Sequence, residues 1–368
     1  MVGGCALHVE SDFILVLRSD AFRHCWGNAM ATALQQRLLH MTAAGIGSPQ
    51  DVADLTVGDW AQLLVMARQH GLCPLLHRRL GDEAAAAGVP KPFADVIAES
   101  FRKHTLRAAE VQAEVARIQR IMRENEIPAV FLKGAFLAFH VYRPPALRPM
   151  WNLDVLVPEA QEADALHALQ TSSRRRPGRS LDAPVVQIAL EFHTRLTDPT
   201  PWRAARRADP AFDADTWNGL ISRVVAEEEV WYLSPEDQLL HLVLHALYDD
   251  PLNCRPLVLT DIAELLGHTQ MNWIRFWQRA VAGNWSAGCW LLLNLAKHFY
   301  PAVSFNPPED LELAPLPPHP AAVAATLTLG RPQERLEASR QLKLQVRNGP
   351  LHFVLELLGQ GRRPADVL

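Results

Sequence analysis

Hydrophobic and polar residues follow an informative pattern between residues 128 and 158, where two apolar strands are predicted on either side of a glycine turn and a helix. The second predicted strand carries Asn152 and Asp154 two positions apart. Successive side chains of a strand point to opposite faces, so this polar pair shares one face and the aliphatic residues take the other. A polar pair on an otherwise apolar strand needs an explanation, and a functional site, a strand end or an Asx turn would each provide one.

Most of the remaining chain shows the period of amphipathic helices. Thr56 and Asp59 form a capping box, which predicts the start of one helix. A long helix with one apolar stripe is expected to end at residues 125–128. Ser234 and Pro235 predict another helix start, because serine is a favoured cap and proline fits the first turn. Further helices are expected over residues 257–266, 273–281 and 287–300.

A third alternating segment, residues 185–193, predicts a strand on which Glu191 and His193 share a face. Residues 230–233 are expected to be extended. The fold class is therefore predicted as α+β, a small mixed β-sheet flanked by N-terminal and C-terminal helical regions. The predicted divisions are an N-terminal helical region at 1–127, an α/β core at 128–200, a C-terminal helical region at 201–300, and a proline-rich linker with a helical tail at 301–368.

Composition narrows the class of protein. The chain has 368 residues, 49% hydrophobic and 21% charged, which suits a globular protein with a sizeable core. A formal net charge of -4 does not imply a nucleic-acid partner. The five cysteines form no CxxC pair, and no long apolar run opens the chain. A cytoplasmic protein without a membrane span is expected.

The polar residues of the predicted sheet suit phosphoryl or nucleotidyl transfer. Such sites need oxygen ligands that converge on magnesium, because the ion neutralises the triphosphate and holds the leaving pyrophosphate in line. Asp154, one pleat from Asn152, and Glu191 on a neighbouring strand meet this need. The Lys133-Gly134 turn would let the backbone approach phosphates while Lys133 supplies positive charge.

These motifs resemble a known family. The order is Lys133-Gly134, then Tyr142, then Arg148-Pro-Met150, then Asn152-Leu-Asp154. It is similar to the bacterial nucleotidyltransferase-like family of the polymerase-beta nucleotidyltransferase superfamily, in the branch whose motif reads LKG, then Y, then RPMxDxDxLV. Segments at 190–196, 233–245 and 259–265 extend the likeness.

The resemblance implies roles for single residues. Asn152 and Asp154 stand at the metal-binding carboxylate pair, Glu191 at the third carboxylate, and Lys133 and Gly134 at the phosphate-side turn. Arg148 could meet a phosphate, or it could pair with an acid at the mouth of the sheet. The implied reaction moves a nucleoside monophosphate from a nucleoside triphosphate to an unknown acceptor, which could be a small molecule, a peptide or a protein, with Mg²⁺ as cofactor.

Asn152 departs from the family motif. Its amide oxygen can bind magnesium, but it lacks the negative charge of a carboxylate. The sequence therefore leaves two alternatives open. The protein is either an active nucleotidyltransferase or a catalytically inactive family member that acts as a binding or regulatory partner. A third is a helical scaffold with an incidental sheet.

Other polar residues have plainer interpretations. His241 and His245 stand one helical turn apart, the spacing of a zinc site, and Asp261 is a conceivable third ligand. No glutamate follows His241, and packing histidines are commoner at such positions. His193 could orient Glu191, touch substrate or serve a structural hydrogen bond. The arginine run at 174–179 could bind an anionic substrate or polymer, although a solvated loop is the commoner outcome for such runs.

Overall fold

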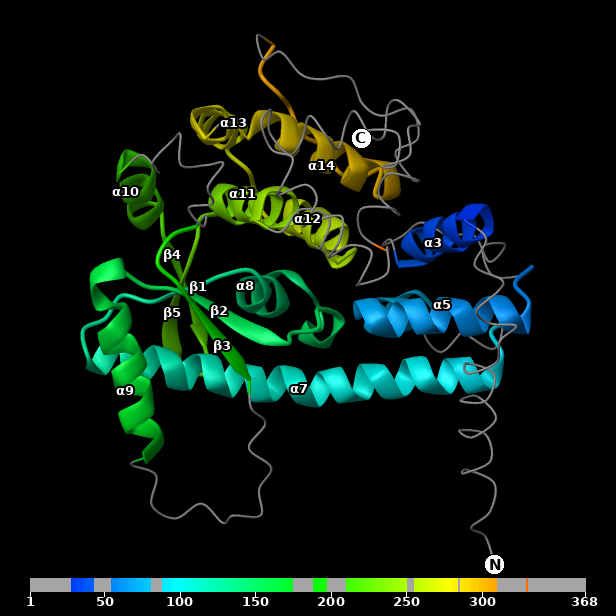
Figure 1. Cartoon of the computed structure of the whole chain (residues 1–368), viewed down its shortest axis with the longest axis horizontal. Helices are drawn as coiled ribbons and strands as arrows, with labels where there is room; N and C mark the ends of the chain where they lie inside the picture. The colour runs from blue at the N-terminus through cyan, green and yellow to red at the C-terminus, as the bar shows by residue number, and fades with distance from the viewer. Residues whose placement is uncertain are drawn as a thin grey trace, which may run out of the picture.

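The computed structural model has an α+β fold in which helices surround a five-stranded mixed sheet (Figure 1). This confirms the predicted fold class. The structure describes residues 28–42, 54–80, 88–174, 188–196, 210–249, 255–283, 285–309 and Leu329. The predicted arginine loop and the C-terminal tail lie mostly outside the described residues.

The sheet has the strand order β3-β2-β1-β5-β4. Central β1 pairs antiparallel with β2 and parallel with β5, and β2 pairs parallel with β3. β4 and β5 form an antiparallel hairpin at one edge. The strands are β1 (Val130–Phe131), β2 (Asn152–Leu156), β3 (Ala189–His193), β4 (Ile221–Val225) and β5 (Glu228–Tyr232).

Strand β4 was not predicted from the sequence. It is an edge strand in which only Val225 is fully buried, so it lacks a strong apolar signal. Its hairpin turn places Ala226 and Glu227 at φ values of 46° and 72°. Two positive φ values define a type I′ turn, which usually contains asparagine and glycine. The turn therefore carries no recognisable sequence signature.

Helices of the N-terminal region precede the sheet in the chain. They are α3 (Asn28–Thr42), α5 (Val57–His70), α6 (Cys73–Leu80) and α7 (Lys91–Glu124). The predicted capping box of α5 is present, since the Asp59 amide donates to Thr56 Oγ1 at 3.2 Å and the Thr56 amide donates to the Asp59 carboxylate at 2.9 Å. Helix α7, with 34 residues, runs along one side of the sheet and continues beneath the N-terminal helices (Figure 1).

Two arginines of α7 attach this long helix to the sheet. Arg120 and Arg123 donate to the two carboxylate oxygens of Glu228 on β5, at 2.8 and 2.7 Å. Val111, Val115, Ile118 and Met122 form the buried stripe that the helical period predicted. The sheet therefore has a fixed backing on the α7 side.

The segment between β1 and β2 is compact. It contains α8 (Gly134–Phe136), a π-helical turn (Leu137–Val141) and a 3₁₀ turn (Pro145–Leu147). A 3₁₀ turn (Glu159–Gln161) and α9 (Glu162–Arg174) follow β2, and α10 (Pro210–Asn218) precedes β4. The predicted order of strand, turn, helix, loop and strand is confirmed.

C-terminal helices cover the side of the sheet opposite α7 (Figure 1). They are α11 (Pro235–Leu244), a π-helical turn (His245–Asp249), α12 (Leu257–His268), α13 (Trp273–Ala282) and α14 (Ser286–Phe299). The predicted start of α11 is confirmed, because Ser234 Oγ accepts from the Asp237 amide at 3.3 Å. No helix within the described ranges is both long and apolar enough to cross a membrane.

Candidate functional site

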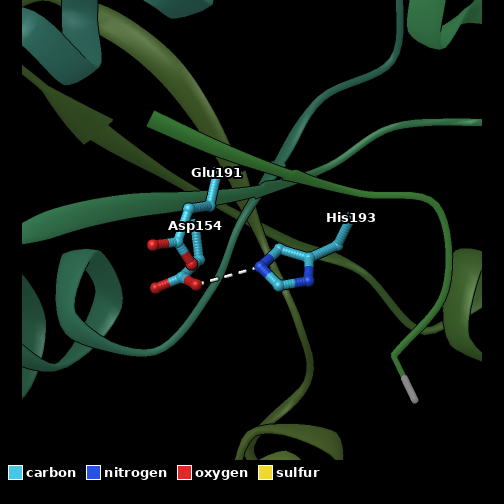
Figure 2. Close-up of side chains that lie close together, drawn as sticks. All are labelled: Asp154, Glu191 and His193. Atoms are coloured by element: carbon cyan, nitrogen blue, oxygen red, sulfur yellow. Dashed lines mark hydrogen bonds and ion pairs between the residues drawn. The ribbon is translucent and has the colours of Figure 1, made fainter. Parts of the chain in front are cut away.

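Parallel pairing of β2 and β3 brings two carboxylates side by side. Asp154 and Glu191 are register partners, while Asn152 pairs with Ala189. His193 follows Glu191 by two positions and therefore shares its face. Ligand atoms of Asp154, Glu191 and His193 all lie within 4.8 Å of one another. Figure 2 shows the three side chains close together, with His193 hydrogen-bonded to Asp154. The sheet thus gathers three side chains that could hold a metal ion.

Asp154 is the buried member of this group, with 6% of its surface exposed. Its Oδ1 accepts from Lys133 Nζ at 3.1 Å and lies 2.9 Å from His193 Nε2. Burial raises the pKa of Asp154, but the hydrogen bond from His193 and the Lys133 ammonium outweigh it, so the pKa lies well below its usual range. Asp154 is therefore ionised at neutral pH.

Lys133 reaches Asp154 from an unusual backbone conformation. Its φ is 46° and its ψ is -112°, values of the first central residue of a type II′ turn, where glycine is usual. Leu132 continues the pairing of β1 with β2, because its amide donates to the Asp154 carbonyl at 2.9 Å. Side chains alternate along a strand, so residue 133 would lie on the face opposite Leu132. A conformation of this kind costs on the order of 1–3 kcal/mol and is found preferentially at functional sites.

Gly134 serves close packing. A Cβ atom at this position would lie 3.3 Å from Met150 Cγ and 3.5 Å from Arg148 Nη1. The positive φ of the predicted glycine turn falls on Lys133, one residue earlier. Gly134 therefore allows the β1–α8 turn to approach the segment that leads into β2.

Asn152 and Glu191 occupy the more open part of the site. Asn152 is half-buried at the first position of β2, on the same face as Asp154. Glu191 is exposed, so its carboxylate is free to adjust toward a ligand. The structure therefore places both predicted residues beside Asp154. Their predicted role in binding metal stays a prediction.

Arg148 takes part in a buried network that leaves the sheet. Its Nε donates to Asp261 Oδ1 at 2.8 Å and its Nη2 donates to Asp261 Oδ2 at 2.9 Å. Nη1 donates to the Pro149 carbonyl at 2.7 Å, and the Tyr142 hydroxyl donates to Asp261 Oδ1 at 2.8 Å. Of the two alternatives for Arg148, pairing with an acid is observed, and contact with a phosphate stays a prediction.

The hydrogen bonds of Asp261 also test the alternative of a zinc site formed by His241, His245 and Asp261. Both carboxylate oxygens of Asp261 are engaged by Arg148 and Tyr142, so Asp261 acts as an anchor between α12 and the loop before β2. His241 is buried, whereas His245 is exposed. These three residues do not form a metal-binding group among the described residues.

Sequence reasoning missed the partner of His193. The pattern placed His193 beside Glu191, but its ring nitrogen is hydrogen-bonded to Asp154, 39 residues earlier. The sequence does not give the register of two parallel strands, and a shift of one residue moves every side chain to the other face. The pairing of His193 with Asp154 therefore could not be predicted. The signal present in the sequence was that Glu191 and His193 are two positions apart, which places both side chains on one face of the strand.

The geometry defines a class of site. An ionised carboxylate, a second carboxylate on the adjacent strand and an imidazole offer oxygen and nitrogen ligands suited to a divalent cation. A lysine stands beside them. This combination suits chemistry on phosphate groups, in which a cation and an ammonium balance negative charge.

Comparison with known families gives the particular assignment. Residues 56–301 match the model of a family described as uncharacterised nucleotidyltransferase. Because the match spans more than half of the chain, the protein belongs to this family. Neither the curated proteins nor the solved structures include a match. The general resemblance is confirmed, and the branch with the LKG, Y and RPM motifs stays a prediction.

Proposed function

We propose that the protein transfers a nucleoside monophosphate from a nucleoside triphosphate to an acceptor. Family membership supports nucleotidyl transfer in general. The observation that carries the proposal is the register of β2 and β3, which sets Asp154 directly beside Glu191. An ionised carboxylate next to a second one is what a site for a divalent cation requires.

The residues present fit a magnesium ion. Asp154 and Glu191 supply two carboxylates, and Asn152, one pleat from Asp154, can supply an amide oxygen. Magnesium prefers oxygen ligands and keeps several waters, so few protein ligands suffice. When bound, the ion would balance the charge of the triphosphate and lower the pKa of the attacking hydroxyl.

The remaining residues of the site have roles that do not depend on the ion. His193 donates to Asp154 and fixes the orientation of its carboxylate. Lys133 holds an ammonium at the same oxygen and can pair with a phosphate group of the substrate. Gly134 lets the turn lie against Met150. Arg148, through Asp261, holds the loop that leads into β2.

A second candidate function is that of an inactive member that binds a partner or a nucleotide without turnover. Two observations favour it. Asn152 carries no charge where the family motif has a carboxylate. In addition, Asp154 Oδ1 already has two hydrogen-bond partners, Lys133 and His193. A cation must compete with both, so its affinity is expected to be lower than at a site with two free carboxylates.

Titration calorimetry tests the first proposal. ATP or GTP is titrated with Mg²⁺ into the full chain, into Asp154→Asn, and into Asp95→Asn as a control at an exposed carboxylate on α7. We expect binding by the unaltered protein and by the control, and loss of binding in Asp154→Asn. Equal heats for all three proteins, or no heat for any of them, would contradict the proposal.

Asn152→Asp separates the two candidate functions. The assay follows transfer of α-labelled nucleotide to the protein or to added acceptors, together with release of pyrophosphate. Turnover that appears only in Asn152→Asp supports the inactive member. Turnover by the unaltered protein supports the enzyme and makes Asn152 an adequate ligand.

A further inference from the structure

Trp151 is an exposed tryptophan directly before the candidate site in the chain. It precedes Asn152, the first residue of β2, and follows Met150, whose Cγ would lie 3.3 Å from a Cβ atom added at Gly134. Each residue of a strand advances the chain by about 3.3 Å, so the backbone of Trp151 is roughly 10 Å from that of Asp154. Trp151 is therefore a close neighbour of the residues that are proposed to bind the cation and the triphosphate.

Two other parts of the fold hold the indole ring of Trp151 in place. Arg255, two residues before α12, places its guanidinium carbon 3.8 Å from the centroid of the ring, which is the geometry of a cation–π contact. The edge of the ring lies against Gly71, the C-cap of α5, where an added Cβ atom would be 2.7 Å from Trp151 Cζ2. Segments that are far apart in the chain therefore fix the orientation of this ring.

The indole is left partly open in spite of these contacts. Trp151 is 41% exposed, although tryptophan is highly buried on average and its large ring gains free energy from burial. Arg255, which covers part of the ring, is itself exposed. A ring whose orientation is already fixed loses little side-chain entropy when a ligand stacks on it. The pair of Trp151 and Arg255 is therefore suited to receive a planar group.

A nucleoside triphosphate brings such a planar group to the site. The side chains gathered around Asp154 are charged or polar, which suits a cation and phosphate groups. A nucleobase has flat faces that stack on aromatic rings and on arginine guanidinium planes. The ribose separates the base of a nucleotide from its phosphates, so the base contacts a neighbouring part of the site. Trp151 occupies a neighbouring position of this kind.

We propose that the Trp151 indole and the Arg255 guanidinium form the nucleobase subsite, and that a purine is the preferred base. The two fused rings of a purine cover more of the indole than the single ring of a pyrimidine does, so more apolar surface is removed from water. Stacking depends on ring size and not on one hydrogen-bonding pattern, so ATP and GTP are expected to bind equally well, and CTP more weakly. This inference rests on the proposed function, because it assumes that the site takes a nucleoside triphosphate.

Titration calorimetry with Mg²⁺ present tests the proposal on the full chain and on Trp151→Leu. The ligands are ATP, CTP and inorganic tripolyphosphate, which carries the phosphates without a base. We expect Trp151→Leu to weaken ATP binding roughly tenfold, which corresponds to about 1.4 kcal/mol and lies within the range found for a stacked base. Tripolyphosphate is expected to bind both proteins equally well. The preference for ATP over CTP is expected to disappear in Trp151→Leu.

Three further variants make the outcome specific. Trp151→Phe keeps an aromatic ring and is expected to recover most of the ATP affinity. Trp231→Leu removes a tryptophan on β5 that is 38% exposed, and it is expected to leave all three affinities unchanged. Gly71→Ala displaces the indole and is expected to weaken ATP binding without changing tripolyphosphate binding. Circular dichroism and thermal unfolding establish that each variant is folded, and Trp151→Gln replaces Trp151→Leu if the latter does not fold.

The outcomes separate this inference from the proposed function. If Trp151→Leu weakens ATP and tripolyphosphate binding equally, or weakens neither, the nucleobase subsite is refuted while binding of the triphosphate still stands. If CTP binds the unaltered chain as tightly as ATP does, the purine preference is wrong. Where tripolyphosphate binding is too weak to measure, the ratio of ATP to CTP affinity decides, and an unchanged ratio in Trp151→Leu refutes the inference. If the unaltered chain binds neither nucleotide nor tripolyphosphate, the proposed function falls and this inference falls with it.

Discussion

Replacing Asp261 with asparagine is expected to destabilise the protein strongly. Asp261 is 1% exposed and accepts three hydrogen bonds from Arg148 and one from Tyr142. Asparagine keeps the shape and the acceptor for Tyr142. It removes the negative charge and presents an amide group to the guanidinium.

The magnitude follows from the burial of both partners. The side chain of Arg148 is 14% exposed and that of Asp261 is 2% exposed, so the guanidinium remains in the interior without a counter-charge. Removing one partner of a buried ion pair costs about 3–5 kcal/mol. This is a large share of the total stability of a folded domain, which is on the order of 5–15 kcal/mol.

Urea unfolding followed by circular dichroism measures this loss as the change in the free energy of unfolding between Asp261→Asn and the unaltered chain. The matched control is Asp95→Asn, which breaks the exposed Lys91–Asp95 pair, whose side chains are 83% and 63% exposed. Exposed pairs contribute about 0–1 kcal/mol. A loss for Asp261→Asn no larger than that of the control would refute the assignment of the Arg148–Asp261 pair as an anchor.

Three further predictions follow from single contacts. The folded-state pKa of Asp154 is depressed, so its contribution to stability is present above the unfolded-state value and is lost as pH falls through the folded-state pKa. The free energy of unfolding, measured at pH 5 and at pH 3, checks this prediction. Asp154→Asn is expected to lose less stability between these two pH values than the unaltered chain does. An equal loss in both proteins would contradict the prediction. Gly71→Ala is expected to cost roughly 1–3 kcal/mol of folding stability, since Gly71 has a φ of 72° and an added Cβ would clash with the Trp151 ring. Thermal unfolding within 1 °C of the unaltered chain would argue against this close approach. His241→Leu is expected to leave the free energy of unfolding unchanged or to raise it, because it removes two buried nitrogens that have no hydrogen-bond partner in the described part of the chain. A loss above about 2 kcal/mol would indicate a partner for this ring.

Local features of the fold were readable from the sequence. The caps at Thr56 and Ser234 depend on residues only three positions apart, so the pattern alone located the starts of α5 and α11. Strand alternation likewise placed Asn152 on the same face as Asp154. These features depend on the geometry of a single element, which neighbouring residues determine.

Pairings between distant elements were not readable. The partner of Arg148 is 113 residues away, and two alternatives stood open for this residue until the contact with Asp261 was seen. Strand β4 escaped prediction because its type I′ turn lacks glycine and its residues are half exposed. The backbone conformation of Lys133 was also hidden, since nothing in its neighbours requires a positive φ.

The sequence by itself determined most of the helices, the strands that carry Asn152, Asp154 and Glu191, and the candidate chemistry of their polar residues. Helical and strand periods, caps and the polar pair on β2 are encoded over a few residues. Only the tertiary structure decided which charges meet. The register of β2 with β3 set Asp154 beside Glu191 and His193, and the packing of α12 brought Asp261 into contact with Arg148. These contacts depend on how separate elements are packed, and no local pattern specifies that packing.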